Sequence, residues 1–288
     1  MKDIPTSPRI IEIRHKRRVK RMRLVILFFI LLVFIIGGLA FFSANKNVVI
    51  DKVVVSGNHI IDEEDIEKEI NKNISGRYIY LFSKNNSFIY PHKKIYDSLL
   101  VTFPRIEKLS IYHDNLKTLH IDISERTGSY LYCGENLPEN KSEIGENCYF
   151  VNNDGFIFDK APYFSGDVYF KYYMTIENNT SNPLGKQMLD IDHFHELARF
   201  IDAINAIGFK PIYISLDQMG TYSLYLDANK GGTLPKILFK NNDDYRIIQD
   251  NLSLAMKKKE FSSEINSKYG SLLYVDLRFK NKVLYKFQ

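Results

Sequence analysis

The 288-residue sequence lacks tryptophan and has only two cysteines, Cys133 and Cys148. Two cysteines cannot supply the four ligands of a structural zinc site, so a metal centre built on cysteine is excluded. No internal repeat of fixed period occurs, and no proline- or serine-rich linker interrupts the chain. A repeat architecture is therefore excluded, and the domain boundaries have to be inferred from the hydrophobic pattern.

The sequence also lacks the serine nucleophile elbow, the HExxH zinc motif, the Walker phosphate loop and the GxGxxG nucleotide motif. His193 and His195 are two positions apart, so on a helix they point about 200° away from each other and cannot bind one ion together. Asp154 and Asp159 flank a glycine turn, where carboxylates commonly bond to the local backbone. We therefore expect no enzyme activity, no metal and no cofactor.

Positive charge is concentrated in a short N-terminal segment. Residues 1–23 carry nine Lys and Arg against Asp3 and Glu12, whereas the whole chain carries 39 basic and 34 acidic residues. The remainder therefore carries 30 basic and 32 acidic residues and is close to neutral. Because nucleic-acid binding needs a basic face on the folded domain, the composition argues against a nucleic-acid partner.

A run of nineteen residues without charge, Leu24–Phe42, follows the basic tail. At 1.5 Å per residue a helix of this length spans about 28 Å, close to the thickness of the bilayer hydrocarbon. We expect a transmembrane helix over 24–42, with the basic tail 1–23 in the cytoplasm as a topology signal and anionic-lipid anchor. The alternatives are a cleaved signal peptide, a buried core helix, and a tail that binds a cytosolic protein.

The two cysteines lie in the part of the chain that such a helix would export. A disulfide between Cys133 and Cys148 would close a loop of about fifteen residues and stabilise the fold by about 3 kcal/mol. Two free thiols are the alternative. Residues 134–147 between them form a polar segment.

The segment 45–124 has the pattern of a small α+β module. Residues 48–57 are rich in Val and predict a strand, and Asp62 precedes an acidic first turn, which predicts a helix N-terminus rather than a cation site. A second helix is expected from about Pro91 to Thr102, and strands are expected at 106–113 and 116–124. The predicted order is strand, helix, helix, strand, strand.

The segment 125–288 is predicted to be β-rich with two helices. The pattern predicts strands and helices in the following order: strands at 129–132, 149–151, 155–158 and 168–174, a helix at 192–207, strands at 212–216, 222–226 and 234–239, a helix at 243–259, and a last strand or strand pair within 272–285. Asn152–Gly155 supplies a turn whose residues tolerate positive φ.

Several motifs resemble, in their order, the bacterial division proteins FtsQ and DivIB. VVVSGN and FPRIEKLSI within 45–124 resemble a polypeptide-transport-associated (POTRA) domain placed after one membrane span, and ISER at 123–126 resembles the Glu-Arg motif that closes it. CYFVNNDGFIFDKAP at 148–162 resembles the hairpin of their β domain. KILF at 236–239, the helix after it and YVDLRF at 274–279 resemble their terminal strand–helix–strand unit.

The chain departs from this family at two places. The family has proline shortly after Glu-Arg and tryptophan in the next strand, whereas Thr127 and Gly128 stand here and tryptophan is absent. The 134–147 segment resembles an insertion. The expected organisation is therefore a basic tail 1–23, a span 24–42, a POTRA-like domain 45–124 and an FtsQ-type β domain 125–288.

The resemblance implies a non-enzymatic scaffold at the division septum, single-pass in the cell membrane, that recruits FtsB- and FtsL-like partners. A terminal strand at a sheet edge can accept a partner strand, because its backbone groups are unpaired on one side. The residues expected at this edge are Arg278, Phe279, Lys280, Asn281, Val283 and Tyr285. An ordinary solvated strand is the alternative at this edge, and a membrane-anchored extracytoplasmic enzyme or cell-wall-binding protein is the alternative function.

Overall fold

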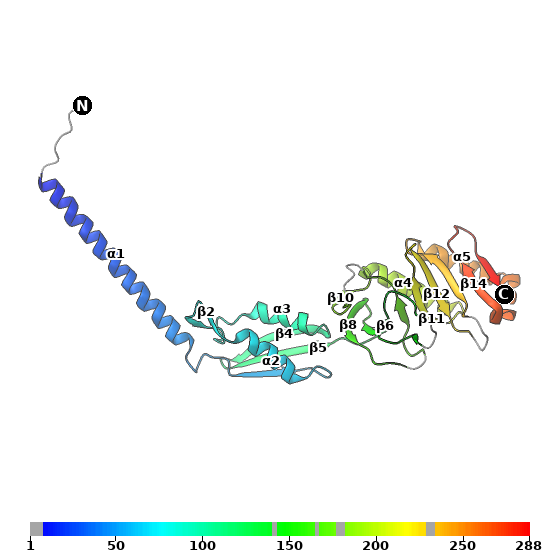
Figure 1. Cartoon of the computed structure of the whole chain (residues 1–288), viewed down its shortest axis with the longest axis horizontal. Coiled ribbons are helices and arrows are strands. Elements are labelled where there is room, and N and C mark those ends of the chain that lie inside the picture. The colour runs from blue at the N-terminus through cyan, green and yellow to red at the C-terminus, as the bar shows by residue number, and fades with distance from the viewer. Residues whose placement is uncertain (1–7, 140–142, 165–166, 177–181, 229–233) are drawn as a thin grey trace, which may run out of the picture. The chain divides into compact units, whose positions relative to one another are not determined.

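The computed structural model describes residues 8–139, 143–164, 167–176, 182–228 and 234–288. Residues 1–7 of the basic tail and residues 140–142 between the cysteines lie outside this part. Within it the chain is a mixed α+β protein, which confirms the expected class, and it divides into two compact units (Figure 1). Unit 1 comprises Met1–Leu100 and Lys108–Ser124, and unit 2 comprises Val101–Glu107 and Glu125–Gln288.

The helices and strands of each unit follow in chain order. In unit 1 they are α1 (Pro8–Ser43), β1 (Lys52–Ser56), α2 (Glu63–Ile74), β2 (Arg77–Tyr78), β3 (Phe82–Ser83), α3 (His92–Thr102), β4 (Ile106–Asn115) and β5 (Thr118–Glu125), the last residues of α3 and β5 and the first of β4 belonging to unit 2. In unit 2 they are β6 (Tyr130–Tyr132), β7 (Tyr149–Val151), β8 (Phe156–Lys160), β9 (Lys171–Tyr173), β10 (Lys186–Gln187), α4 (Ile191–Ala206), β11 (Pro211–Leu216), β12 (Thr221–Leu226), β13 (Lys236–Lys240), α5 (Tyr245–Lys257), α6 (Lys259–Ser267), β14 (Leu272–Asp276) and β15 (Leu284–Phe287).

Helix α1 contains the predicted apolar run but starts well before it. The helix is continuous from Pro8, so the described part of the basic segment is helical as well. From His15 to Ser43 it is long and apolar enough to cross a membrane, and its most apolar stretch is not buried by the rest of the protein. The side chains from Leu24 to Phe42 are mostly exposed.

The rest of unit 1 is a three-stranded sheet with two helices and a small hairpin. The sheet has the order β1-β5-β4, and β1 and β5 are parallel. Ile66 and Ile70 of α2 and Ile95 and Leu99 of α3 are fully buried, because their spacing places them on one side of each helix. Asp62 occupies the N-cap position of α2, although its side chain makes no capping hydrogen bond.

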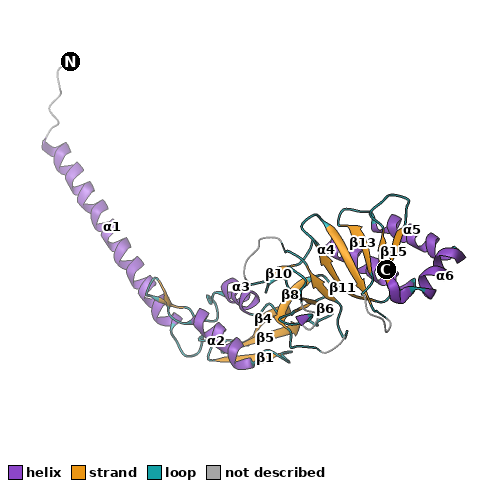
Figure 2. Cartoon of the chain, turned by 45° about the vertical axis from the view of Figure 1, so that its right-hand side comes forward, coloured by secondary structure: helices purple, strands orange, loops and turns teal. Residues whose placement is uncertain are grey.

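The β2–β3 hairpin between α2 and α3 was not predicted from the sequence. It has only two residues in each strand, with Tyr78 opposite Phe82. The hairpin lies beside the C-terminal end of α1 (Figures 1 and 2), where the backbone N–H of Ser83 donates to Ser43 Oγ at 3.1 Å. A strand pair this short carries too little periodicity to be recognised.

Unit 2 is built on a ten-stranded mixed sheet in the order β10-β8-β7-β6-β9-β11-β12-β13-β14-β15. Strands β6, β9 and β11 are parallel neighbours, as are β13 and β14, and the other neighbouring pairs are antiparallel. Side chains in register share one face: Tyr172, Ile214, Leu224, Ile237 and Val275 form one continuous buried row across it.

Three helices cover this buried face, where the sequence predicted two. Phe194, Leu197 and Phe200 of α4 belong to the same hydrophobic core as the sheet, together with residues of α5 and α6. The predicted helix 243–259 is wrong at its end, because Lys258 adopts an extended backbone that separates α5 from α6. The chain therefore turns there and brings Phe261 and Ile265 onto the core.

The segment Val101–Glu107 belongs to unit 2, although the sequence interpretation placed it inside the first domain. Within this segment the Arg105 guanidinium lies 2.5 Å from Asp159 and 3.9 Å from Glu125, both of unit 2. The backbone N–H of Arg126 also donates to the carbonyl of Arg105 at 2.8 Å. This ion-pair network connects residues far apart in sequence, which a local pattern does not reveal.

Candidate functional site

Strand β15 forms one edge of the ten-stranded sheet. It pairs with β14 in antiparallel register, with Tyr285 opposite Val275, and no described strand pairs with its other side. The backbone N–H of Gln288 donates to the Ser271 carbonyl at 2.9 Å. Since inward and outward groups alternate along an antiparallel strand, Tyr285 and Phe287 direct their N–H and C=O groups away from β14. These outward groups can accept another strand.

The six residues expected at this edge occupy two different structures. Tyr285 lies in β15, whereas Arg278, Phe279, Lys280, Asn281 and Val283 lie in the connection between β14 and β15. This end of the chain is a strand pair, one of the two alternatives predicted, and a turn separates its strands: Asn281 has φ of +60°, and the N–H of Lys282 donates to the Phe279 carbonyl at 3.2 Å. Phe279 is 50 % exposed in this connection. The edge itself is made of residues 284–287.

Arg278 has an internal partner. Its guanidinium donates two hydrogen bonds to Asp276, at 2.9 and 2.6 Å, and its backbone N–H donates to the same carboxylate at 3.1 Å. Burial alone would raise the pKa of Asp276, but these hydrogen bonds outweigh it and hold that pKa below its usual value. The same contact raises the pKa of Arg278. Arg278 therefore neutralises a buried charge at the end of β14.

Tyr285 is supported by α6. Its hydroxyl donates to Glu264 Oε2 at 2.8 Å, and its ring packs edge-on against Phe261 with centroids 5.0 Å apart. The Lys268 ammonium lies 2.9 Å from the Glu264 carboxylate, and the hydrogen bonds from Lys268 and Tyr285 lower the pKa of Glu264. The bond to Glu264 raises the pKa of Tyr285. Helix α6 thus orients one face of the edge strand.

The other residues of β15 were missed as site residues. Leu284 is 45 % exposed and Lys286 is exposed, and both lie on the face opposite to Tyr285 and Phe287. Phe287 packs against Tyr285, with ring centroids 5.6 Å apart. The alternation of Leu284, Tyr285, Lys286 and Phe287 is the sequence signal that could have identified them. No ion pair within the described residues involves Lys280, Lys282 or Lys286, so this edge is basic.

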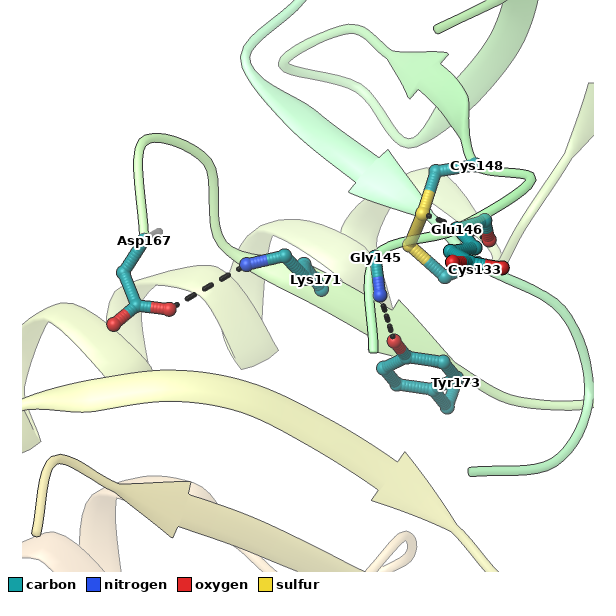
Figure 3. The surroundings of a disulfide bond; sticks show 7 residues. All are labelled: Cys133, Gly145, Glu146, Cys148, Asp167, Lys171 and Tyr173. Carbon is teal, nitrogen blue, oxygen red and sulfur yellow. Dashed lines mark hydrogen bonds and ion pairs between the residues drawn. A yellow bond between two sulfur atoms is a disulfide. The ribbon is translucent and has the colours of Figure 1, made fainter. Parts of the chain in front are cut away.

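Cys133 and Cys148 form a disulfide bond, with their Cα atoms 4.1 Å apart (Figure 3). The bond joins the end of β6 to the residue before β7 and closes the loop between these paired strands. The loop returns over the sheet, where the N–H of Gly145 donates to the Tyr173 hydroxyl at 3.0 Å (Figure 3). Burial raises the pKa of Tyr173. The described part of this loop is thus held to the protein at both ends.

The residues considered for catalysis are held in separate pairs. His193 Nε2 lies 2.8 Å from the Tyr245 hydroxyl, and His195 Nε2 lies 3.0 Å from Asp154. Asp159 is paired instead with Arg105. The histidines contact different partners, as their spacing predicts, and the two carboxylates do not converge on a common site.

Comparison with known proteins adds no identification. No model of a protein family matches the chain, and no curated protein matches it. The function therefore has to be inferred from the residues and the geometry described above.

Proposed function

We propose that the chain is a single-pass membrane scaffold of the bacterial cell division machinery, similar to FtsQ and DivIB. The observation that carries this proposal is the exposed edge strand β15, whose outward backbone groups have no described partner. In this proposal α1 crosses the cell membrane, the basic residues before it stay in the cytoplasm, and both folded units lie outside at the septum.

The architecture of each unit supports the resemblance. Unit 1 has the strand–helix–helix–strand–strand order of a POTRA-like domain, with β2 and β3 as an addition between its helices. In unit 2, β13, α5 and β14 occupy the positions of the strand–helix–strand unit that the KILF and YVDLRF motifs suggested. Strands β13 and β14 pair in parallel, and parallel neighbours need a crossover connection. Helices α5 and α6 supply this connection.

The proposed mechanism is recruitment by strand addition. A segment of an FtsB-like protein, in complex with an FtsL-like protein, would pair with the outward backbone groups of Tyr285 and Phe287. Exposed Leu284 and Phe279 would add apolar contact, and Lys280, Lys282 and Lys286 would select an acidic segment. The scaffold function is favoured over an enzyme because the four candidate catalytic side chains are engaged in three separate pairs.

Photocrosslinking in cells tests this proposal. A photoreactive phenylalanine analogue at Leu284 or Phe279, which are 45 and 50 % exposed, should capture a small membrane protein with a coiled-coil segment. The matched control is Ile247 on α5, which is 54 % exposed on the same unit and should not capture it. Depletion of the protein should produce filamentous cells.

Two results would overturn the proposal. Crosslinks from Leu284 to cell-wall material instead of a small membrane protein would favour the wall-binding alternative. Normal division after depletion would remove the protein from the division machinery altogether.

A further inference from the structure

The β2–β3 hairpin exposes large apolar side chains at its tip. Ile79 is 82 % exposed and Tyr80 is 93 % exposed, and Leu81 beside them is 44 % exposed. The turn that follows the hairpin adds Phe88 and Ile89, which are 71 and 41 % exposed. Together these five side chains form what we call the hairpin patch. An exposed apolar patch of this kind in a folded protein commonly marks an interaction surface.

The backbone at the tip is unusual for the residues that it holds. Ile79 has φ of +49° and Tyr80 has φ of +61°, and the N–H of Leu81 donates to the Tyr78 carbonyl at 2.9 Å. Both φ values are positive, as in a type I′ turn, where asparagine and glycine are favoured at these two positions. A β-branched residue at positive φ is a genuine outlier, and such strain persists where the surroundings or a function require it.

Buried hydrogen bonds hold the hairpin at a defined level beside α1. Ser43, the last residue of α1, is 7 % exposed; its Oγ accepts from the Ser83 N–H at 3.1 Å, and its carbonyl accepts from Asn86 Nδ2 at 3.0 Å. Asn86 is itself 5 % exposed. The N–H of Ser87 also donates to the Val48 carbonyl at 2.9 Å. The end of the apolar helix and the hairpin therefore form one connected structure.

Two clefts show where the hairpin patch lies along the helix. Leu81 lines one cleft together with Ala40 and Phe41, which belong to the last turn of the apolar run. Phe88 and Ile89 line a second, mainly apolar cleft together with Leu39 and Phe42. The patch thus lies at the level of the residues that end the apolar run, on more than one side of the helix. Arg77 lines the first cleft, and Lys46 does so as well.

We propose that the hairpin patch inserts into the headgroup and upper acyl region of the membrane that α1 crosses. This inference rests on the membrane-spanning role in the proposed function. A bilayer that surrounds α1 up to Phe42 meets Leu81, Phe88 and Ile89 at the same depth, because these side chains line clefts with the last turn of the apolar run. Aromatic rings are favoured at the membrane interface, and neighbouring basic side chains can contact lipid phosphates. The lipid surface thus covers apolar side chains that would otherwise be exposed to water.

The absence of tryptophan allows a direct test, since any tryptophan introduced is the only one in the chain. Full-length Tyr80→Trp and Phe88→Trp variants are reconstituted into phosphatidylcholine vesicles that carry bromine on the upper acyl chain, which quenches nearby indole. Phe42→Trp at the end of the apolar run reports the depth of α1. Ile60→Trp is the matched control, because Ile60 is 64 % exposed in the same unit but follows the far end of β1.

The expected result is that Tyr80→Trp and Phe88→Trp are quenched to within a factor of about two of Phe42→Trp, as an element buried about 5–10 Å into the interface requires. Ile60→Trp should keep its emission. Quenching of Phe42→Trp without quenching of either hairpin reporter overturns the insertion but leaves the membrane span intact. Absence of quenching at Phe42→Trp contradicts the span itself, so the two failures are distinguishable. Phe88→Trp still tests the insertion if the Tyr80→Trp variant folds poorly.

Discussion

Arg278 is the residue for which a structural role and a partner-binding role make opposite predictions. Its side chain is 35 % exposed, whereas the Asp276 side chain with which it forms two hydrogen bonds is only 6 % exposed. Replacing Arg278 by alanine leaves a nearly buried carboxylate without its cation. Removing one partner of a buried ion pair costs about 3–5 kcal/mol, and the partial exposure of Arg278 reduces this to about 2 kcal/mol.

The same substitution should reverse the pH dependence of stability in this region. In the wild type the pKa of Asp276 is lowered in the folded state, so the contribution of this group is present above its unfolded pKa of about 3.9 and is lost as the pH falls through the lower folded pKa. In Arg278→Ala, burial is left as the main influence and raises the pKa of Asp276. The variant should therefore lose stability as the pH rises from about 4 towards neutral.

Hydrogen exchange of the full chain in detergent measures this change locally, in peptides covering β13 and β14. Lys280→Ala in the same connection is the control, and it should change local stability by no more than about 0.5 kcal/mol. The double variant with Asp276→Asn should recover part of the loss, because the unpaired charge is gone. A loss below about 0.5 kcal/mol in Arg278→Ala would refute the structural role and leave partner binding as the function of this side chain.

Two further predictions concern the scaffold of unit 2. Replacing both Cys133 and Cys148 by serine should lower the free energy of unfolding by about 3 kcal/mol, because the two cysteines are fifteen residues apart. In thermal unfolding, a reductant should cause the same loss in the wild type and no loss in the double variant. An unchanged melting temperature would contradict this prediction. Gly155→Ala should destabilise unit 2 by about 2 kcal/mol or more, since Gly155 has φ of +81° and an added Cβ would lie 2.8 Å from the Phe194 ring. Urea unfolding measures this, and equal stability of Gly155→Ala and the neighbouring exposed Asn153→Ala would argue against the steric reason.

Local sequence patterns predicted most of the elements that carry a regular period. Helix α4 repeats its apolar residues at helical spacing from Phe194 to Ile204, and the structure buries those side chains. Asn152 and Gly155 marked a turn, and the Asn152 side chain indeed accepts from the backbone N–H groups of Asp154 and Phe156. In each case the signal is contained within one segment and does not depend on distant residues.

The sequence-based predictions fail where a structure is determined by long-range contacts or where an element is very short. The predicted helix 243–259 continued too far because the sequence does not reveal that Phe261 must turn onto the core. Strands β2, β3 and β10 have two residues each and show no period. Five of the six residues expected in the edge strand lie in the connection before it, because the turn at Asn281 adopts positive φ without a glycine to signal it.

Composition and spacing by themselves determined the α+β class, the apolar helix after a basic segment, and the absence of the common enzyme motifs. These properties depend on the order of apolar, charged and glycine residues along the chain. Only the tertiary structure decided that β15 is the edge strand of the described sheet, that Arg278 forms an ion pair with Asp276, and that the hairpin patch lies beside the end of α1. Each of these depends on pairing between segments far apart in sequence, and the geometry of such pairing is not encoded in any one of them.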